Sequence, residues 1–147
     1  LVFLGNIDQS RIPEVKKACA AVAAKMKPFK ISFKGLGVFP GFDWPRVIWL
    51  GLKGDMHSLA ALQKEIEREL EEKGFEFDTK PFRPHVTLGR VKRARSGERR
   101  EIGRQIKGMR EMDLTSEVFV NQVKIFKSKL RPSGAVHKEL ESIKIRG

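Results

Sequence analysis

The spacing of hydrophobic residues changes several times along the chain, and each change predicts a different element. The chain opens on an apolar run, LVFLG at 1–5, which predicts a strand. Apolar residues at helical spacing then predict an amphipathic helix over about 10–26. Alternation follows over 29–39, but the parity of the apolar positions switches near Gly35, which predicts a β-bulge. A further apolar run at 46–52 predicts a buried strand.

The second half of the chain continues with a helix and then with alternating segments. An apolar stripe that ends before Gly74 predicts a second helix, and the stripe consists of Leu59, Leu62, Ile66 and Leu70. The later elements expected are a strand at 82–91, a helix at 97–112, and strands at 118–130 and 135–145. The inward stripe of the later helix is expected to be Ile102, Ile106 and Met109.

The two ends of the chain match when one is shifted by 87 residues. Leu1 then falls on Leu88, the first helix falls on the helix at 97–112, and the parity switch in the following strand is reproduced. We interpret this match as two copies of a strand, helix, strand, strand unit related by pseudo-twofold symmetry. Because Leu88 directly follows His85-Val86-Thr87, the same shift predicts a His-x-Thr motif immediately before Leu1.

The repeat predicts an α+β fold with two pseudo-symmetric lobes in one domain, 1–147. Each lobe is expected to be an antiparallel sheet with helices on its outer face, and an active-site cleft is expected between the lobes. Lobe one is expected at about 1–52, without its N-terminal strand and first motif, and lobe two at about 80–147. On this hypothesis the chain is a fragment of a longer protein.

Charge and cysteine content narrow the class of partner and the compartment. Lys and Arg number 30 against 18 Asp and Glu, a formal charge of +12, which favours an anionic partner: RNA, DNA or a phosphorylated small molecule. A solvated surface of the thermophile type is the alternative for part of this charge. Cys19, the single cysteine, excludes an internal disulfide and is expected to be a buried hydrophobe. No apolar membrane span or signal peptide stands out, so we expect a cytoplasmic protein without a membrane partner.

The strand at 82–91 carries the candidate catalytic chemistry. Alternation points His85 and Thr87 to one side of this strand and turns Arg90 to the other. A hydroxyl can hold a phosphoryl oxygen while a neighbouring imidazole moves a proton. An ordinary packed histidine is the alternative for a single His-x-Thr, and the repeat favours catalysis. Six basic residues between Arg90 and Arg100 are expected to contact an RNA backbone, or else to be a solvated loop.

These motifs together resemble the two-histidine phosphoesterases, and within them the RNA 2′,3′-cyclic phosphodiesterases, also called 2′-5′ RNA ligases. The matching segments, which cover essentially the whole chain, are LVFLG at 1–5, GLGVFP at 35–40, PRVIW at 45–49, HVTLGR at 85–90 and SKLRPSG at 128–134. The sequence departs from the family pattern in two respects. The first His-x-Thr motif is not in the chain, and His137 stands where relatives often carry an aromatic residue.

The resemblance implies hydrolysis of a 2′,3′-cyclic phosphate at an RNA 3′ end to a 2′-phosphate, with possible reverse ligation. One histidine would act as base toward water and its symmetric partner as acid toward the leaving oxygen, with no metal and no other cofactor. By this likeness His85 is the base, Thr87 binds a non-bridging phosphate oxygen, and Arg90 stabilises phosphate or positions RNA. Two further candidates for substrate binding are Phe39, beside a turn, and Arg46, at the start of a strand. The expected partners are RNA with cyclic phosphate ends or cyclic nucleotides, bound by a monomer.

Two alternatives stay open on the sequence. The chain could be a non-catalytic RNA-binding or nucleotide-binding module on the same fold, and with one motif the fragment could be inactive. Turnover of 2′,3′-cyclic nucleotides distinguishes an enzyme from such a module. Within the enzyme class, the runner-up substrate is the cyclic phosphate of ADP-ribose, and the high positive charge favours RNA.

Overall fold

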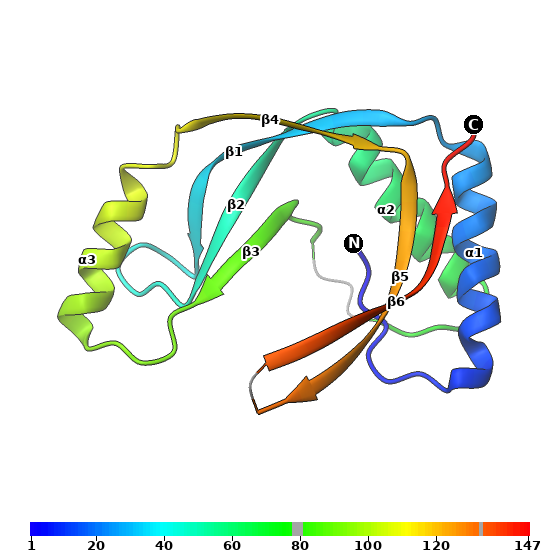
Figure 1. Cartoon of the computed structure of the whole chain (residues 1–147), viewed down its shortest axis with the longest axis horizontal. Coiled ribbons are helices and arrows are strands. Elements are labelled where there is room, and N and C mark those ends of the chain that lie inside the picture. Colours follow the sequence, from blue (N-terminus) through cyan, green and yellow to red (C-terminus); the bar gives the residue numbers. More distant parts are fainter. Residues whose placement is uncertain (78–80, 133) are drawn as a thin grey trace. The chain divides into compact units, whose positions relative to one another are not determined.

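The computed structural model describes residues 1–77, 81–132 and 134–147, which fold as helices and antiparallel sheets (Figure 1). The α+β class is therefore confirmed. The chain forms two compact units. Unit 1 consists of Leu1–Phe29, His57–Phe82 and Phe119–Gly147, and unit 2 consists of Lys30–Met56 and Arg83–Val118.

Two helices with apolar stripes form much of unit 1. Helix α1 spans Ile12–Lys25, follows a 3-10 turn at Gln9–Arg11, and has a proline in its first turn, where no backbone N–H is needed. Helix α2 spans Met56–Glu71, and Gly74 follows it at φ +72°, a conformation that favours glycine. The buried apolar residues of α1 are Val15, Ala18, Cys19, Val22 and Ala23. Those of α2 are Leu59, Leu62, Ile66 and Leu70, the stripe that the spacing predicts.

Unit 1 also contains a two-stranded antiparallel sheet formed by β5 (Gln122–Arg131) and β6 (Gly134–Lys144). Helix α1 packs against both strands, and Val123 is buried there. The ion pair between Lys16 of α1 and Glu141 of β6, at 2.5 Å, fixes the same contact and lowers the pKa of the Glu141 carboxyl.

The strand expected at 1–5 is wrong, because these residues form no strand. Leu1 and Phe3 are exposed, while Val2 and Leu4 are half-buried, so their burial alternates as in an extended chain. A strand needs a backbone partner, and the β5–β6 ladder does not include this segment. Apolar spacing alone does not show whether such a partner is present.

Unit 2 is built on a sheet with the strand order β3-β2-β1-β4. The strands are β1 (Phe29–Phe39), β2 (Val47–Gly54), β3 (His85–Arg90) and β4 (Asp113–Val120). The bulge predicted at Gly35 is confirmed, because the β1–β2 register shifts between Lys34, opposite Gly51, and Leu36, opposite Leu50. Gly35 adopts φ +41°, and its N–H donates to the Met112 carbonyl oxygen at 2.8 Å.

Helix α3 (Ser96–Lys107) lies against the loop that connects β1 to β2. Gly103 faces the Phe42 backbone so closely that an added Cβ would overlap the Phe42 carbonyl oxygen. The helix ends at Lys107, with Gly108 as its C-cap, earlier than expected. The placement of Met109 on the inner stripe is therefore wrong, because Met109 lies beyond the helix and is 43% exposed. Its carbonyl oxygen instead accepts from the Leu36 N–H at 3.1 Å.

The single strand expected at 118–130 is divided in the structure. Strand β4 ends at Val120 and β5 begins at Gln122, in a different sheet. The chain enters unit 2 after Phe29, returns to unit 1 for His57–Phe82, enters unit 2 again at Arg83 and leaves it after Val118. The units are therefore interleaved along the chain, whereas the sequence analysis expected contiguous lobes at about 1–52 and 80–147.

Burial of Cys19 on α1 supports a first prediction. The Cys19 side chain lies in the core of unit 1, and burial raises the pKa of its thiol to about 11. At pH 8 we therefore expect the native protein to react with Ellman's reagent far more slowly than the unfolded chain in guanidinium chloride. Equal rates in the two states would contradict a buried, neutral thiol.

Candidate functional site

The candidate site lies on the β2–β3 half of the unit 2 sheet, because the pairing gathers polar groups on one face. His85 is opposite Gly51 and Thr87 is opposite Trp49 in the antiparallel register. Residues two apart on a strand share a face, so the imidazole and the hydroxyl project from the same side, as expected. Both side chains are exposed, and His85 is thus not a packed core histidine.

One hydrogen bond fixes the chemistry of the two ring nitrogens of His85. Its Nδ1 lies 2.5 Å from the Arg83 carbonyl oxygen. A carbonyl oxygen only accepts, so Nδ1 must carry a proton and donate it. In the neutral ring the lone pair then lies on Nε2, which is the nitrogen able to take a proton from a reactant. Pro84, between the two partners, restricts Arg83 to extended conformations and so helps to hold the acceptor in place.

Two aromatic rings hold the His85 imidazole from the side. The Phe39 ring meets it edge-on, at 5.3 Å between centroids and 86° between planes, and the Trp49 ring lies at 6.3 Å and 64°. Phe39 and Trp49 also contact each other at 5.2 Å. The sequence analysis named Phe39 as a candidate but gave Trp49 no role at the site, because the contact with His85 depends on the register of the strands.

Gly37 explains how the Trp49 ring can lie flat on the sheet. The two residues are opposite each other in the β1–β2 register, and an added Cβ at Gly37 would overlap the six-membered part of the indole. Glycine leaves the space that the ring occupies. The Gly37–Trp49 pair therefore supports the aromatic contact with His85.

Arg90 lies on the same face as His85, which corrects the expectation from simple alternation. Ile48 is opposite Gly89, but Trp49 is opposite Thr87, so Leu88 is an extra residue in β3. This bulge reverses the parity beyond it, and Arg90 comes to lie opposite Val47, on the side of the sheet that carries Trp49 and His85. The exposed guanidinium is thus on the face of the imidazole and the hydroxyl.

Arg46 is held next to this site by its backbone. Its N–H donates to the Phe39 carbonyl oxygen at 2.8 Å, and its carbonyl oxygen accepts from the Val91 N–H at 2.9 Å. Its side chain is exposed. Alternation from Val47 points that side chain to the other face of the sheet, so the pairing does not bring Arg46 together with His85.

The basic cluster from Arg90 to Arg100 contains one residue with a structural role. Arg99 is 9% exposed, donates to the Pro45 carbonyl oxygen at 2.8 Å, and covers the Trp44 ring at 4.8 Å. It therefore fastens α3 to the β1–β2 loop. The cluster members that remain exposed are Arg90, Lys92, Arg93, Arg95 and Arg100.

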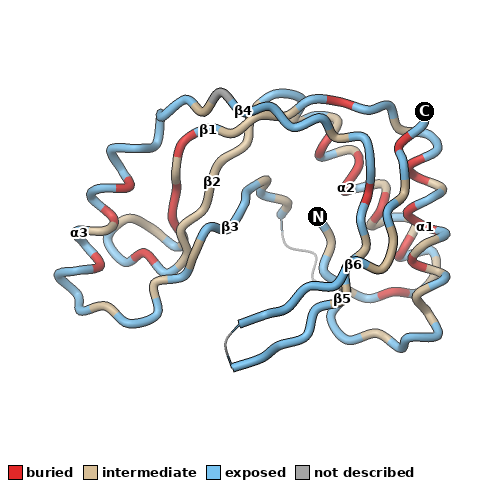
Figure 2. The backbone as a smooth tube through the Cα atoms, viewed as in Figure 1, coloured by how far each residue is buried: buried red, intermediate tan, exposed pale blue. Residues whose placement is uncertain are grey.

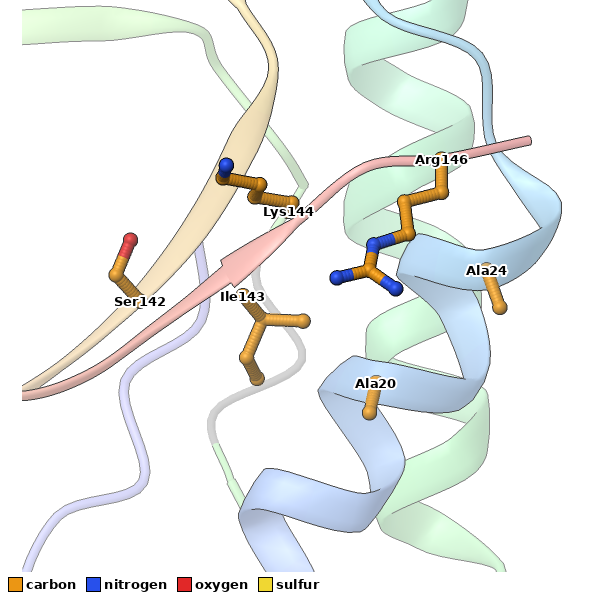
Figure 3. A pocket seen from close by; sticks show the side chains of 6 residues that line it. All are labelled: Ala20, Ala24, Ser142, Ile143, Lys144 and Arg146. Carbon is orange, nitrogen blue, oxygen red and sulfur yellow. The ribbon is translucent and has the colours of Figure 1, made fainter.

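His137 is placed on the β5–β6 hairpin of unit 1. It is opposite Ser128, with the Ser128 hydroxyl oxygen 2.8 Å from its Nδ1, and its side chain is exposed. A hollow with a volume of about 440 Å³ lies along α1 and β6. Figure 3 shows its lining residues, Ala20, Ala24, Ser142, Ile143, Lys144 and Arg146. Neither His137 nor His85 lines this hollow.

Two features are absent from residues 1–77, 81–132 and 134–147. Among these residues, no group of three or more His, Cys, Asp or Glu side chains is arranged to hold a metal ion. No helix in the same ranges has both the length and the apolar character that crossing a bilayer requires.

Solved structures share this fold. TT0787 of Thermus thermophilus superimposes with a TM-score of 0.76 at 24% identity, over 99% of this chain and 75% of that one. Escherichia coli LigT, in a complex with 3′-AMP, superimposes with a TM-score of 0.63 at 18% identity, over 99% of this chain and 74% of that one. At these identities the similarity establishes the fold, which is that of the LigT-type phosphoesterases.

Sequence comparison identifies the family. The model of the 2′-5′ RNA ligase superfamily matches residues 1–127. The RNA 2′,3′-cyclic phosphodiesterase of Aeropyrum pernix is 34% identical over 98% of this chain and 79% of its own length. The enzyme of the same name from Aquifex aeolicus is 34% identical over 100% of this chain and 77% of its own length. The chain belongs to the 2′-5′ RNA ligase superfamily, a family of enzymes, which confirms the resemblance found in the sequence.

Proposed function

We propose that this protein hydrolyses the 2′,3′-cyclic phosphodiester at the 3′ end of RNA and leaves a 2′-phosphate. The observation that carries this proposal is the arrangement on one sheet face of the His85 imidazole, with its Nδ1 proton donated to the Arg83 carbonyl oxygen, and the Thr87 hydroxyl. Family membership and relatives named RNA 2′,3′-cyclic phosphodiesterase support the choice of substrate.

In the proposed reaction His85 acts at Nε2 as the general base. It takes a proton from water as the water oxygen attacks phosphorus, and the bond between phosphorus and the 3′ oxygen breaks. The 3′ oxygen leaves with a proton from a general acid, so the products are a 2′-phosphate and a 3′-hydroxyl. The general acid is proposed to be the imidazole of the first His-x-Thr motif, which the 87-residue repeat predicts before Leu1. In the reverse direction, ligation, the acid and the base exchange roles.

Thr87 and Arg90 are proposed to stabilise the charge that develops on the phosphoryl oxygens. The Thr87 hydroxyl donates to a non-bridging oxygen, and the Arg90 guanidinium, brought to this face by the bulge at Leu88, offers charge-assisted hydrogen bonds. The mechanism needs no metal, because both proton transfers and the charge stabilisation come from side chains. Phe39 is proposed to serve the site by holding His85 and by offering an apolar surface to the nucleoside.

Replacement of the Thr87 hydroxyl tests this division of roles. We expect Thr87→Val to lower kcat/KM for a 2′,3′-cyclic nucleotide about a hundredfold, the effect typical of removing one donor to a developing negative charge. Thr87→Ser, which keeps the hydroxyl and loses the methyl group, should retain most of the activity. The assay measures hydrolysis in the presence of EDTA, with the protein expressed from its complete reading frame.

The outcome also separates the enzyme from a non-catalytic binding module. A protein that binds RNA or nucleotides tightly but never opens the cyclic phosphate would support the module and contradict the proposed function. Equal activity of Thr87→Val and Thr87→Ser would show that the hydroxyl makes no contact with the phosphoryl group. A thermal unfolding midpoint unchanged in both variants confirms that any loss is chemical, since the Thr87 side chain is exposed.

A further inference from the structure

The outer half of the β5–β6 hairpin carries four cations on one face. Lys127 is opposite Lys138, Lys129 is opposite Val136, and Arg131 is opposite Gly134. Opposite residues of an antiparallel pair share a face, and so do residues two apart on one strand. We call the resulting surface, formed by Lys127, Lys129, Arg131 and Lys138, the basic hairpin face. All but the half-buried Lys127 are exposed. Figure 2 shows the outer part of the hairpin in pale blue, the colour of exposed residues.

This side of the hairpin is basic in its outer half and mainly apolar in its inner half. Its inner half is apolar where α1 packs on it, with Val123 buried and Ile125 half-buried. Its acidic residue there, Glu141, is already bound to Lys16 of α1. On the opposite side, Glu139 is bound to Lys124 at 2.8 Å. Within the described part of the chain, no carboxylate forms an ion pair with the four cations.

The clustering of four cations on one face does not stabilise the hairpin itself. Like charges directly opposite each other, as Lys127 and Lys138 are, destabilise an antiparallel pair. An anion bound across them would remove that repulsion. Along β5 the cations at 127, 129 and 131 recur about every 7 Å, twice the rise of a strand residue, which suits a ligand with regularly spaced negative charges.

We propose that the basic hairpin face binds the phosphate backbone of single-stranded RNA. The inference rests on the proposed function for the choice of RNA as the polyanion, and it adds a binding surface in unit 1 to the candidate catalytic groups of unit 2. Contacts to phosphates carry no sequence information, so the surface is expected to bind RNA without regard to base identity. A formal charge of +12 attracts RNA to the protein as a whole. The experiment must therefore distinguish binding at the basic hairpin face from this general attraction.

Two triple variants with equal charge make that separation. One carries Lys129→Gln, Arg131→Gln and Lys138→Gln on the basic hairpin face. The control carries Lys17→Gln, Lys27→Gln and Lys64→Gln, which are exposed positions of unit 1 outside the hairpin. Each variant loses three positive charges, so an effect of net charge alone would be the same in both.

Fluorescence anisotropy measures their binding to a labelled RNA of roughly a dozen nucleotides that ends in a plain 3′-hydroxyl. We expect the hairpin variant to bind about tenfold or more weakly than the control at low salt. The slope of log Kd against log salt should become shallower by about 2, since each phosphate contact to a single strand contributes about 0.7. Equal affinities and equal salt slopes for the two variants would overturn the inference.

This test is independent of catalysis. The RNA has no cyclic phosphate, so the result stands whether or not the protein hydrolyses one. If the unmodified protein does not open the cyclic phosphate in the Thr87 assay but its RNA binding depends on the hairpin, the proposed function is contradicted and the binding surface stays in place. Normal turnover together with equal RNA binding by the two triple variants would support the proposed function and contradict the binding surface.

Discussion

His85→Ala should abolish hydrolysis of 2′,3′-cyclic nucleotides while the protein stays folded. A general base contributes about 100-fold to 10,000-fold to the rate. Among the described residues, the rings in contact with His85 are those of Phe39 and Trp49, and neither can take a proton from water. The loss should appear in kcat more than in KM. Because the His85 side chain is exposed, its removal leaves no buried cavity, and the free energy of unfolding should change little.

Two matched variants show whether the lost group is the base or only a structural contact. His85→Asn keeps an N–H that can donate to the Arg83 carbonyl oxygen and lacks the basic nitrogen, so it should be as inactive as His85→Ala. His57→Ala removes another exposed histidine, in α2 of unit 1, and should keep full activity. Activity retained in His85→Asn would show that the ring serves only through its hydrogen bond.

Gly35→Ala is expected to have the largest effect on stability. Gly35 adopts φ +41°, where an alanine is strained by roughly 1–2 kcal/mol. An added Cβ would also overlap the Arg110 carbonyl oxygen, so the chain must move away from the segment before β4. That movement weakens the bonds from the Gly35 and Leu36 N–H groups to the Met112 and Met109 carbonyl oxygens. Together these effects predict a loss of about 2–4 kcal/mol in the free energy of unfolding.

Denaturation by urea, followed by circular dichroism, measures this loss. The matched control is Gly97→Ala in α3, where the added Cβ would meet no atom within 4 Å and alanine favours the helix. The control should be neutral or slightly stabilising. A Gly35→Ala protein as stable as its Gly97→Ala counterpart would show that the bulge does not need glycine.

Long periodic segments could be predicted from the sequence because tertiary packing agrees with their spacing. The stripe Leu59, Leu62, Ile66 and Leu70 is buried on α2, and the change of parity at Gly35 is a bulge in β1. In both cases many residues report the same period. The His85 and Thr87 positions could also be placed on one face, because two residues on a short strand need only local alternation.

Features that depend on pairing between distant segments could not be predicted in this way. The bulge at Leu88 leaves no parity change in a six-residue strand, so alternation placed Arg90 on the wrong face. The Trp49 ring, which contacts His85, occupies the space left by Gly37 on the paired strand. The end of α3 at Lys107 and the division of one apolar run into β4 and β5 depend on hydrogen bonds and on the sheet that each strand joins. The spacing of apolar residues carries no information on either.

The order of the two repeats along the chain also did not predict which helices and strands make up each of the two compact units. Helix α1 packs with β5 and β6, from the other end of the chain, and α3 lies in one unit with β1 and β2. Sequence repetition identifies equivalent segments, and it does not say whether a helix packs with the strands of its own copy or of the other copy.

Phosphorus-31 NMR of a short RNA with a 2′,3′-cyclic phosphate end, incubated with the protein from its complete reading frame and EDTA, tests the central role of His85 most directly. We predict that the cyclic phosphate resonance is replaced by that of a 2′-phosphomonoester, and that the substrate stays intact with His85→Ala. Conversion at the same rate by the His85→Ala protein, or no conversion by the unmodified protein, would contradict the account.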